Sequence, residues 1–363
     1  MTRVRLAEPY VDDEIRQAVL EVIDSRNYVD GEYTRRFEEM FSNYIGVKES
    51  VAVSSGTSSL YLILKALGVG KGDKVAVPSF TFIATASQVV EVGATPIFID
   101  VDLDTMTMDP NDLETKMDDD VKAVIPVHLF GHPADLEHIV EVSEKYGAYV
   151  IEDAAQAHGA LYKDSKVGGL GDVGYFSLYP SKNLGVYGEG GIVTTNDVEL
   201  AEKIRALKNH GIVDGEIKMF GYNMKFSEIN AVVAIHQLEK LDNWNNIRRR
   251  NARLYNERLS KSQDLEIPIE KEWALHVYNL YTIKTLFRDK VAEALKRENI
   301  SYGIYYSKPI HMMNIVRERF GYVKLRNTEK LKDLVISIPV HQFLSEENVL
   351  HISDVILRAV DST

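Results

Sequence analysis

Residues 148–159 read AYVIEDAAQAHG, a short apolar run that ends in two adjacent carboxylates and continues into small residues. An apolar run of this length, closed by polar and small residues, is typical of a strand buried on both faces of a parallel sheet. In such sheets, ligands bind beyond the carboxyl ends of the strands. The pattern therefore predicts a buried strand over residues 148–153 and a ligand site just after it.

Six further short apolar runs lie on both sides of this stretch along the chain. They cover residues 51–54, 74–78, 96–100, 121–127, 175–178 and 191–195. Helical patterns separate several of them, at residues 58–66, 83–92 and 134–146. Strands that alternate with helices predict an α/β fold in which a mostly parallel sheet lies between layers of helices.

The last third of the chain has a different pattern. A long helical stretch begins near Phe226, with Ser227 at a plausible N-cap position, and continues through residues 248–253. Strand-like patterns then follow at residues 276–285, 302–305 and 334–338. Because 363 residues are more than one core usually serves, we expect a large domain over residues 1–245 and a smaller α+β domain over residues 246–363.

Composition excludes several classes of protein and site. The net charge of −12 argues against binding to nucleic acid, which requires a basic face. The absence of cysteine rules out disulfides and thiol nucleophiles and fits a cytoplasmic protein. Residues 1–10 lack the apolar core of a secretory signal, and no run of ~20 apolar residues predicts a membrane span. The ten histidines show no metal-ligand spacing, so we expect no metal site.

Residues 169–174, GLGDVG, match the glycine pattern of dinucleotide-binding proteins. That motif requires a strand before it and a helix after it. Here it follows a polar turn at residues 163–166 and opens the apolar run at 175–178. A nicotinamide-dependent oxidoreductase is therefore an alternative that the sequence disfavours.

Residues 54–59, SSGTSS, lie between a predicted strand and a predicted helix. Small residues at a helix N-terminus let backbone N–H groups approach a phosphate, although an ordinary helix cap has the same composition. After the next strand, Phe80 is more consistent with core packing. Phe82 is the candidate to cover the face of a flat cofactor ring.

Two further blocks carry groups that a flat, nitrogen-containing cofactor would need. In the 152–159 block, Asp153 could pair with a protonated ring nitrogen and Gln156 with a ring oxygen, although Asp153 could also be a helix cap. The second block, residues 177–191, reads SLYPSKNLGVYGEGG and holds the single lysine Lys182 in a loop of small residues. An imine-forming lysine must lose its proton, which requires burial or a nearby cation.

These blocks together resemble the DegT/StrS-type sugar aminotransferases, enzymes of fold type I that use pyridoxal phosphate to aminate nucleotide-linked ketosugars. The likeness extends from residues 28–31 (YVDG) to 309–311 (PIH) and is most specific at 152–159 and 182–191. It implies transfer of an amino group from L-glutamate to a nucleotide-linked keto-(deoxy)hexose. It also implies a fold type I large domain followed by a smaller C-terminal one.

The resemblance implies roles for individual residues. Lys182 is similar to the lysine that holds the cofactor as a Schiff base, Asp153 to the partner of its pyridine nitrogen, and Gln156 to the residue near its ring oxygen. The residues that resemble the phosphate binders are Gly56, Thr57 and Ser177. In this family the asparagine at the position of Asn223 comes from a neighbouring subunit, which implies a homodimer with shared active sites.

The resemblance leaves alternatives open. Related dehydratases carry histidine at the position of Lys182, so lysine favours transamination over dehydration. The block at 179–185 resembles enzymes that aminate C3 of the hexose, whereas 188–191 resembles enzymes that aminate C4, and we favour C3 slightly. A binding protein on a retired enzyme fold is disfavoured by the intact Asp153–Lys182 pair.

The substrate side of the site is the least defined by the sequence. The residues expected to contact the sugar are His158, Tyr187, Glu189, Tyr305 and His311. Residues 312–334 match the family poorly, and Lys225 stands where arginine is more frequent, so neither receives a role.

Overall fold

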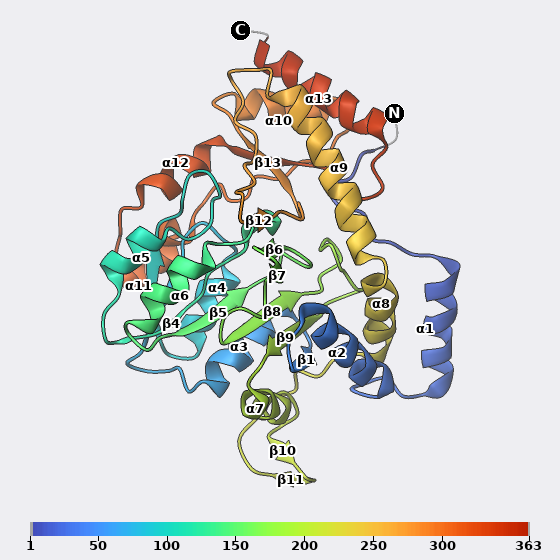
Figure 1. The fold of residues 1–363 in the computed structure, drawn as a ribbon, viewed down its shortest axis with the longest axis vertical. Coiled ribbons are helices and arrows are strands. Elements are labelled where there is room, and N and C mark those ends of the chain that lie inside the picture. Colours follow the sequence, from blue (N-terminus) through green and yellow to red (C-terminus); the bar gives the residue numbers. More distant parts are fainter. Residues whose placement is uncertain (1–2, 362–363) are drawn as a thin grey trace.

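A seven-stranded sheet runs through the centre of the computed structural model, which describes residues 3–361 (Figure 1). Its strand order is β1-β9-β8-β5-β4-β2-β3, and β9 alone is antiparallel to its neighbours. The strands of this sheet are β1 Glu49–Val53, β2 Lys74–Pro78, β3 Thr95–Ile99, β4 Val121–Val124, β5 Tyr149–Asp153, β8 Val173–Ser177 and β9 Gly191–Thr195. The predicted α/β fold with a mostly parallel sheet is confirmed.

Helices cover both faces of this sheet. Successive side chains of each strand point to opposite faces, so both faces carry apolar residues that pack against helices. Along β2, Val75 and Val77 pack with α3 and α4, whereas Ala76 packs with α5 and α6. The helices and 3-10 turns up to residue 238 are α1 Asp13–Ser25, α2 Glu32–Ile45, α3 Gly56–Ala66, α4 Ala84–Glu91, α5 Pro110–Lys116, η1 Leu129–Gly131, α6 Leu136–Glu144, α7 Val198–Lys208 and α8 Glu228–Leu238. Three short pairs of strands complete this part: β6 Leu161–Tyr162 with β7 Ser165–Lys166, β10 Ile212–Val213 with β11 Glu216–Ile217, and β12 Ala274–Leu275 with β6.

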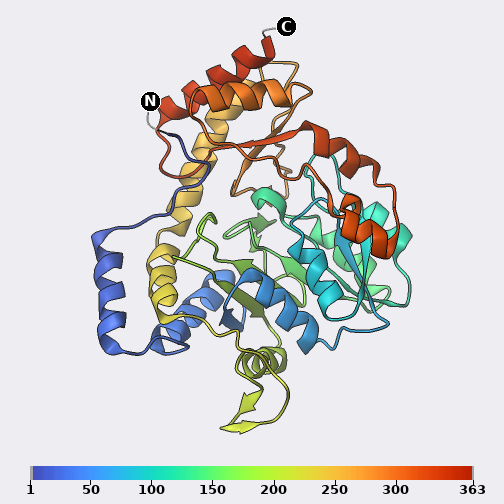
Figure 2. The same cartoon turned by 180° about the vertical axis from the view of Figure 1, so that it is seen from behind.

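The C-terminal part builds a second core around an antiparallel pair of strands. Buried residues of the long helix α9, such as Tyr255 and Leu259, pack there with Ile283, Ile336 and other apolar side chains. Its elements are α9 Leu241–Leu259, β13 Tyr281–Lys284, α10 Arg288–Arg297, η2 Ile310–Met312, α11 Asn314–Phe320, α12 Arg326–Leu334, β14 Val335–Ile338 and α13 Glu346–Asp361. Figures 1 and 2 show α9, α10 and α13 together at one end of the molecule. The boundary near residue 245 stays a prediction.

The predicted long helix from Phe226 is in fact two helices. α8 ends at Leu238 and α9 begins at Leu241, and a turn at Glu239 and Lys240 separates them. The break lets the two parts serve different cores: Val233 of α8 packs beside α2, whereas Tyr255 of α9 packs in the C-terminal core. Ser227 occupies the N-cap position of α8, but its side chain makes no capping hydrogen bond.

Two strand predictions in the C-terminal part were wrong in extent. Residues 276–280 are irregular, and regular pairing begins only at Tyr281. Residues 302–305 form no strand, because Gly303 alone pairs with Ser337 before the chain turns away. Both irregular segments bring side chains to the central cavity described below.

The glycine motif at 169–174 leads into β8 and not into a helix, as predicted. Its glycines serve close packing: a Cβ on Gly171 would lie 2.7 Å from the carbonyl oxygen of Val150. No helix within residues 3–361 is long and apolar enough to cross a membrane.

Candidate active site

A cavity of about 590 Å³ lies at the carboxyl ends of the central strands. It collects residues that follow β1, β2, β4, β5 and β8, as expected for a parallel sheet. The candidate residues that line it are Gly56, Thr57, Phe82, Asp153, Gln156, Ser177, Lys182, Glu189 and Tyr305. The structure therefore brings together most of the residues singled out from the sequence.

Asp153 ends β5 and is nearly buried, with 5% of its surface exposed. Its Oδ2 accepts hydrogen bonds from Tyr175 Oη at 2.5 Å and Thr85 Oγ1 at 3.1 Å, and Oδ1 accepts one from the Ala155 N–H at 3.1 Å. Burial raises the pKa of Asp153, while these donors and the charge of Lys182 oppose the rise. The carboxylate is therefore fixed in place by three donors before any ligand arrives.

Lys182 lies in the loop between β8 and β9, and its amine makes no hydrogen bond or ion pair with residues 3–361. Burial lowers the pKa of Lys182 from 10.5 to about 8, and the carboxylate of Asp153 works against this shift. Both side chains line one cavity and act on each other electrostatically. That they hold one cofactor between them stays a prediction.

Three asparagines hold the loop that carries Lys182. Asn183 is buried and donates to Asn245 Oδ1 at 2.8 Å and to the Val277 carbonyl at 3.0 Å. Asn279 donates to Asn183 Oδ1 at 3.0 Å. Segments far apart in the sequence thus fix the backbone next to the lysine.

The start of α3 faces the cavity with its free backbone N–H groups. Ser55 caps the helix by accepting from the Ser58 N–H at 3.0 Å. Gly56 follows, and a Cβ there would lie 2.9 Å from Ser177 Cβ. Because Gly56 has no side chain, the N-terminus of α3 and the end of β8 can approach each other. Both segments line the cavity.

Aromatic and amide groups line the opposite side. Phe82 is 56% exposed, although it is a large apolar side chain, whereas Phe80 is buried in the core as predicted. Gln156 Oε1 accepts from the Phe130 N–H at 2.8 Å, and Gln156 also hydrogen-bonds the hydroxyl of Tyr306. Burial raises the pKa of Tyr306, so this hydroxyl keeps its proton over the physiological range.

The predicted sugar contacts divide into two groups. Glu189 and Tyr305 line the cavity, but three others do not. His158 is fully buried against Phe176, and burial lowers its pKa to about 3. His311 is fully buried and pairs with Ser79 Oγ at 2.6 Å. These two histidines are therefore corrected to core residues.

Tyr187 and Asn223 also lie away from this cavity. The Tyr187 hydroxyl donates to the Tyr10 carbonyl at 2.7 Å, which turns it toward the N-terminal segment. Asn223 is exposed and follows the β10–β11 hairpin, which projects from the bottom of the molecule in Figure 1. A single chain does not bring Asn223 to its own cavity.

Several cavity residues escaped the sequence analysis, namely Thr85, Tyr175, Asn279 and Tyr306. Tyr175 lies inside a predicted strand, where an apolar role is the default. Asn279 lies in an irregular segment that resembled a strand, and Tyr306 directly follows another. Only the position of Thr85, shortly after Phe82 and a strand end, offered a signal.

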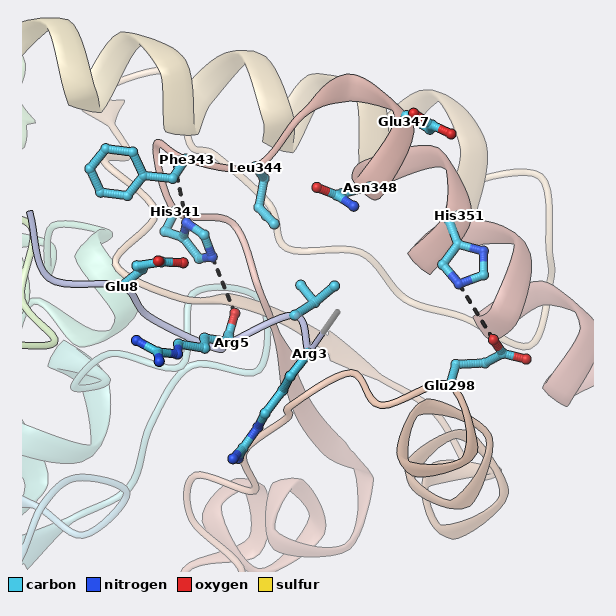
Figure 3. Close-up of a pocket in the computed structure, with 11 residues that line it drawn as sticks. Arg3, Arg5, Glu8, Glu298, His341, Phe343, Leu344, Glu347, Asn348 and His351 are labelled. Atoms are coloured by element: carbon cyan, nitrogen blue, oxygen red, sulfur yellow. Dashed lines mark hydrogen bonds and ion pairs between the residues drawn. The ribbon is translucent and has the colours of Figure 1, made fainter. Parts of the chain in front are cut away.

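A second cavity of about 500 Å³ lies between the N-terminal segment and the start of α13 (Figure 3). Arg3 and Arg5 line it, and His341 Nε2 donates to the Arg5 carbonyl at 3.2 Å. The neighbouring Leu6 and Ala7 line the larger cavity, so the N-terminal segment contributes to the walls of both. None of the candidate residues lines the second cavity.

The relatives of this chain include aminotransferases. The model of the DegT/DnrJ/EryC1/StrS aminotransferase family matches residues 9–357. The chain is 40% identical to the UDP-N-acetyl-3-dehydro-alpha-D-glucosamine 3-aminotransferase of Acidithiobacillus ferrooxidans, over 96% of this chain and 94% of that protein. It is 35% identical to the dTDP-3-amino-3,4,6-trideoxy-alpha-D-glucose transaminase of Streptomyces venezuelae, over 94% and 91% of the two chains.

The fold is also that of a solved relative. The crystal structure of Streptomyces venezuelae DesV in complex with a ketimine intermediate superposes with a TM-score of 0.92 at 35% identity, covering 95% of this chain and 94% of that one. The family match spans nearly all of the described residues, including every segment that lines the cavity apart from Leu6 and Ala7. The chain belongs to the DegT/DnrJ/EryC1/StrS aminotransferase family.

Proposed function

We propose that this chain is a pyridoxal-phosphate-dependent aminotransferase that moves an amino group from L-glutamate to C3 of a nucleotide-linked ketohexose. One observation supports it above all: the Lys182 amine and the Asp153 carboxylate share one cavity, and the amine has no partner among residues 3–361. An amine that lines a cavity without a protein partner is available to a ligand there. The family of the chain supplies the reaction class.

The cavity fits pyridoxal phosphate. Lys182 would hold the cofactor through its amine, and Asp153 would hold the proton of the ring nitrogen. Gly56, Thr57 and Ser177 would take the phosphate, since Gly56 leaves the α3 N-terminus open beside Ser177. The remaining two contacts would be Phe82 over the ring face and Gln156 near the ring oxygen. When bound, pyridoxal phosphate supplies an aldehyde for the amine and a ring that withdraws electrons from the reacting carbon.

Lys182 and Asp153 would have different roles in the reaction, proton transfer for the lysine and orientation of the cofactor for the carboxylate. Lys182, with a pKa of about 8, is neutral in about a tenth of molecules at pH 7, and its amine can both take and return a proton. Tyr175 and Thr85 donate to Asp153 and so favour its charged form, against the effect of burial, which raises its pKa. Lysine at position 182 also favours transamination over the dehydration that a histidine there would indicate.

The position of amination follows the relatives. The Acidithiobacillus enzyme is named as a 3-aminotransferase, and the Streptomyces enzyme is named for a 3-amino sugar. One carries UDP and the other dTDP in its name, so the carbon is shared between them while the nucleotide is not. Glu189 and Tyr305 are the candidates of this chain to contact the sugar, because both are polar and line the cavity.

We also propose a homodimer in which Asn223 serves the partner's cavity. The hairpin that precedes Asn223 exposes Phe220 almost completely and Ile217 largely, which is unusual for apolar side chains of an isolated chain. Asn223 is itself exposed and does not line its own cavity. A second copy placed on the hairpin would bury these groups.

The test is a pair of half-reactions on the purified protein. With L-glutamate the protein is expected to form 2-oxoglutarate once per site. The resulting form is then offered nucleotide-linked 3-ketohexoses and 4-ketohexoses, and amino sugar is measured by mass spectrometry. We expect amination of a 3-ketohexose and loss of both half-reactions in Lys182→Ala. Full turnover by Lys182→Ala, or amination of 4-ketohexoses alone, would contradict the proposal.

A further inference from the structure

The carboxylate next to Asp153 has no role in the proposed chemistry, yet it is fully buried. Glu152 Oε1 accepts from the N–H groups of Leu170 at 2.6 Å and Gly171 at 2.7 Å. Its Oε2 accepts from the Gly168 N–H at 2.7 Å and lies 3.1 Å from His128 Nε2. Buried polar groups in proteins are hydrogen-bonded, and both oxygens of this carboxylate have partners.

The hydrogen bonds fix the proton of His128. Its Nδ1 accepts from the Ala134 N–H at 2.9 Å, so this nitrogen carries no proton. The proton of a neutral ring is then on Nε2, which donates to Glu152. Burial works against ionisation of Glu152, but the donors from His128 and the glycine loop lower the pKa of its carboxyl below the usual value. Glu152 is therefore an anion held by four donors.

The glycine motif that resembled a dinucleotide site is explained by this contact. The backbone N–H groups of Gly168, Leu170 and Gly171 converge on an anion, as N–H groups do in phosphate-binding loops, but the anion is the chain's own carboxylate. Glycine is required because a Cβ on Gly168 would lie 2.4 Å from Phe176 and one on Gly171 would lie 2.7 Å from the Val150 carbonyl.

Glu152 and Asp153 are consecutive on β5, so their side chains point to opposite faces of the sheet. Glu152 ties the start of β8 to β5, while the His128 N–H donates to the Asp153 carbonyl at 3.0 Å and ties in the end of β4. Asp153 also pairs in register with Tyr175, its shortest hydrogen-bond donor. The three segments joined on one face thus carry Val127, Asp153 and Tyr175 into the cavity on the other.

We propose that Glu152 is a positioning residue that sets the place of Asp153 for the transfer reaction, acting from the opposite face of the sheet through the glycine loop and His128. This inference rests on the proposed function, because it assigns Glu152 to the same site. Glu152 itself touches neither cofactor nor substrate.

The test compares Glu152→Gln with a matched control, Glu228→Gln. Glu228 is also buried and accepts from three backbone N–H groups, those of Gly31, Tyr33 and Thr34, each at 2.9 Å. It is the first residue of α8, its carboxylate lies against the start of α2, and it does not line the cavity. Each substitution places an amide against backbone donors, so both variants lose comparable hydrogen bonds.

Two readouts separate positioning from general stability. In cofactor-free protein, hydrogen–deuterium exchange should rise in Glu152→Gln over residues 168–175 and 153–156 and stay at the wild-type level there in Glu228→Gln. In the loaded enzyme, the single-turnover rate with saturating L-glutamate should fall about tenfold in Glu152→Gln, with little change in the glutamate concentration for half-maximal rate. Glu228→Gln should keep the wild-type rate.

A wild-type single-turnover rate in Glu152→Gln, or an equal loss in Glu228→Gln, would overturn the inference. If Glu152→Gln does not fold, His128→Leu removes one donor and leaves the carboxylate, and it should show a smaller fall in the same rate. Absence of cofactor absorbance in the wild type would contradict the proposed function instead. The exchange experiment needs no cofactor and would still test Glu152.

Discussion

At the scale of single residues, burial acts in opposite directions on the two groups that the reaction needs. It raises the pKa of Asp153 and lowers the pKa of Lys182, and each group partly counters the effect on the other. Tyr175, Thr85 and the Ala155 N–H hold Asp153 as an acceptor, whereas the Lys182 amine has no such partner among residues 3–361. The site is therefore rigid at its carboxylate and open at its amine.

The rate at which cofactor-free protein captures pyridoxal phosphate should follow the neutral fraction of Lys182. Since the neutral amine is the nucleophile, the rate should rise with pH through a midpoint at about 8, well below 10.5. Stopped-flow absorbance over pH 6.5 to 10 measures this.

Asp153→Asn provides the control for the capture experiment. The carboxylate of Asp153 raises the pKa of Lys182, so its removal should move the midpoint to lower pH. A midpoint near 10.5 in the wild type would contradict the burial of the amine.

The sequence identified the two key residues because Asp153 ends an apolar run that predicts a strand and Lys182 lies in the loop that follows another such run. Lys182 and Asp153 could be singled out by that position alone, and family resemblance supplied their roles. His158 and His311 were predicted as sugar contacts, but they lie in the core. The sequence of a matching block does not show whether a histidine side chain points to the ligand or to the core. The His158 side chain packs on Phe176, and the His311 side chain hydrogen-bonds Ser79.

At the scale of elements, contact between the start of α3 and the end of β8 shapes the phosphate end of the cavity. Ser55 caps the helix, and Gly56 permits the close approach to Ser177. Periodicity located both elements approximately: the helical pattern at 58–66 and the apolar run at 175–178 overlap α3 and β8. It could not locate the irregular stretches at 276–280 and 302–309, whose paths depend on pairing with distant residues such as Ser337.

Gly56→Ala should weaken cofactor binding. The added Cβ would lie 2.9 Å from Ser177 Cβ, closer than real Cβ contacts, so the helix end and β8 must separate. Overpacking of this kind costs about 1–3 kcal/mol of stability, which thermal unfolding would register. Equilibrium dialysis should show a higher dissociation constant for pyridoxal phosphate.

Gly70→Ala is the matched control for this change. A Cβ at Gly70 meets only the Val92 carbonyl at 3.6 Å, an ordinary contact, and Gly70 lies outside the cavity. It should bind the cofactor as the wild type does. Equal effects of the two substitutions would contradict the role assigned to the contact between α3 and β8.

At the scale of the whole molecule, the C-terminal segments complete a cavity that the central sheet begins. Asn279 and Tyr306 reach the site from beyond α9, and Asn183 is tied to both Asn245 and Val277. Buried neutral histidines lie along this junction. Burial lowers the pKa of His132 and of His341 to about 4, and that of His276 well below its usual value.

These histidines should make the fold sensitive to acid. Their folded-state pKa values lie below the unfolded value of 6.5, so between pH 6.5 and 4 the unfolded chain binds more protons. Stability should therefore fall as pH falls through this range, by up to about 1.4 kcal/mol per pH unit for each such histidine. Urea unfolding at pH 7, 6 and 5 would measure the slope, and His341→Gln should reduce it. An unchanged slope in that variant would exclude His341 as a contributor.

The central claim is that one lysine and one carboxylate hold the same flat cofactor from two sides. Reduction of the loaded enzyme with borohydride, followed by peptide mass mapping, tests it most directly. The account predicts a phosphopyridoxyl mass on the peptide that contains Lys182 and no labelled peptide in Lys182→Ala. A label on another lysine, or none on a protein that turns over, would contradict it.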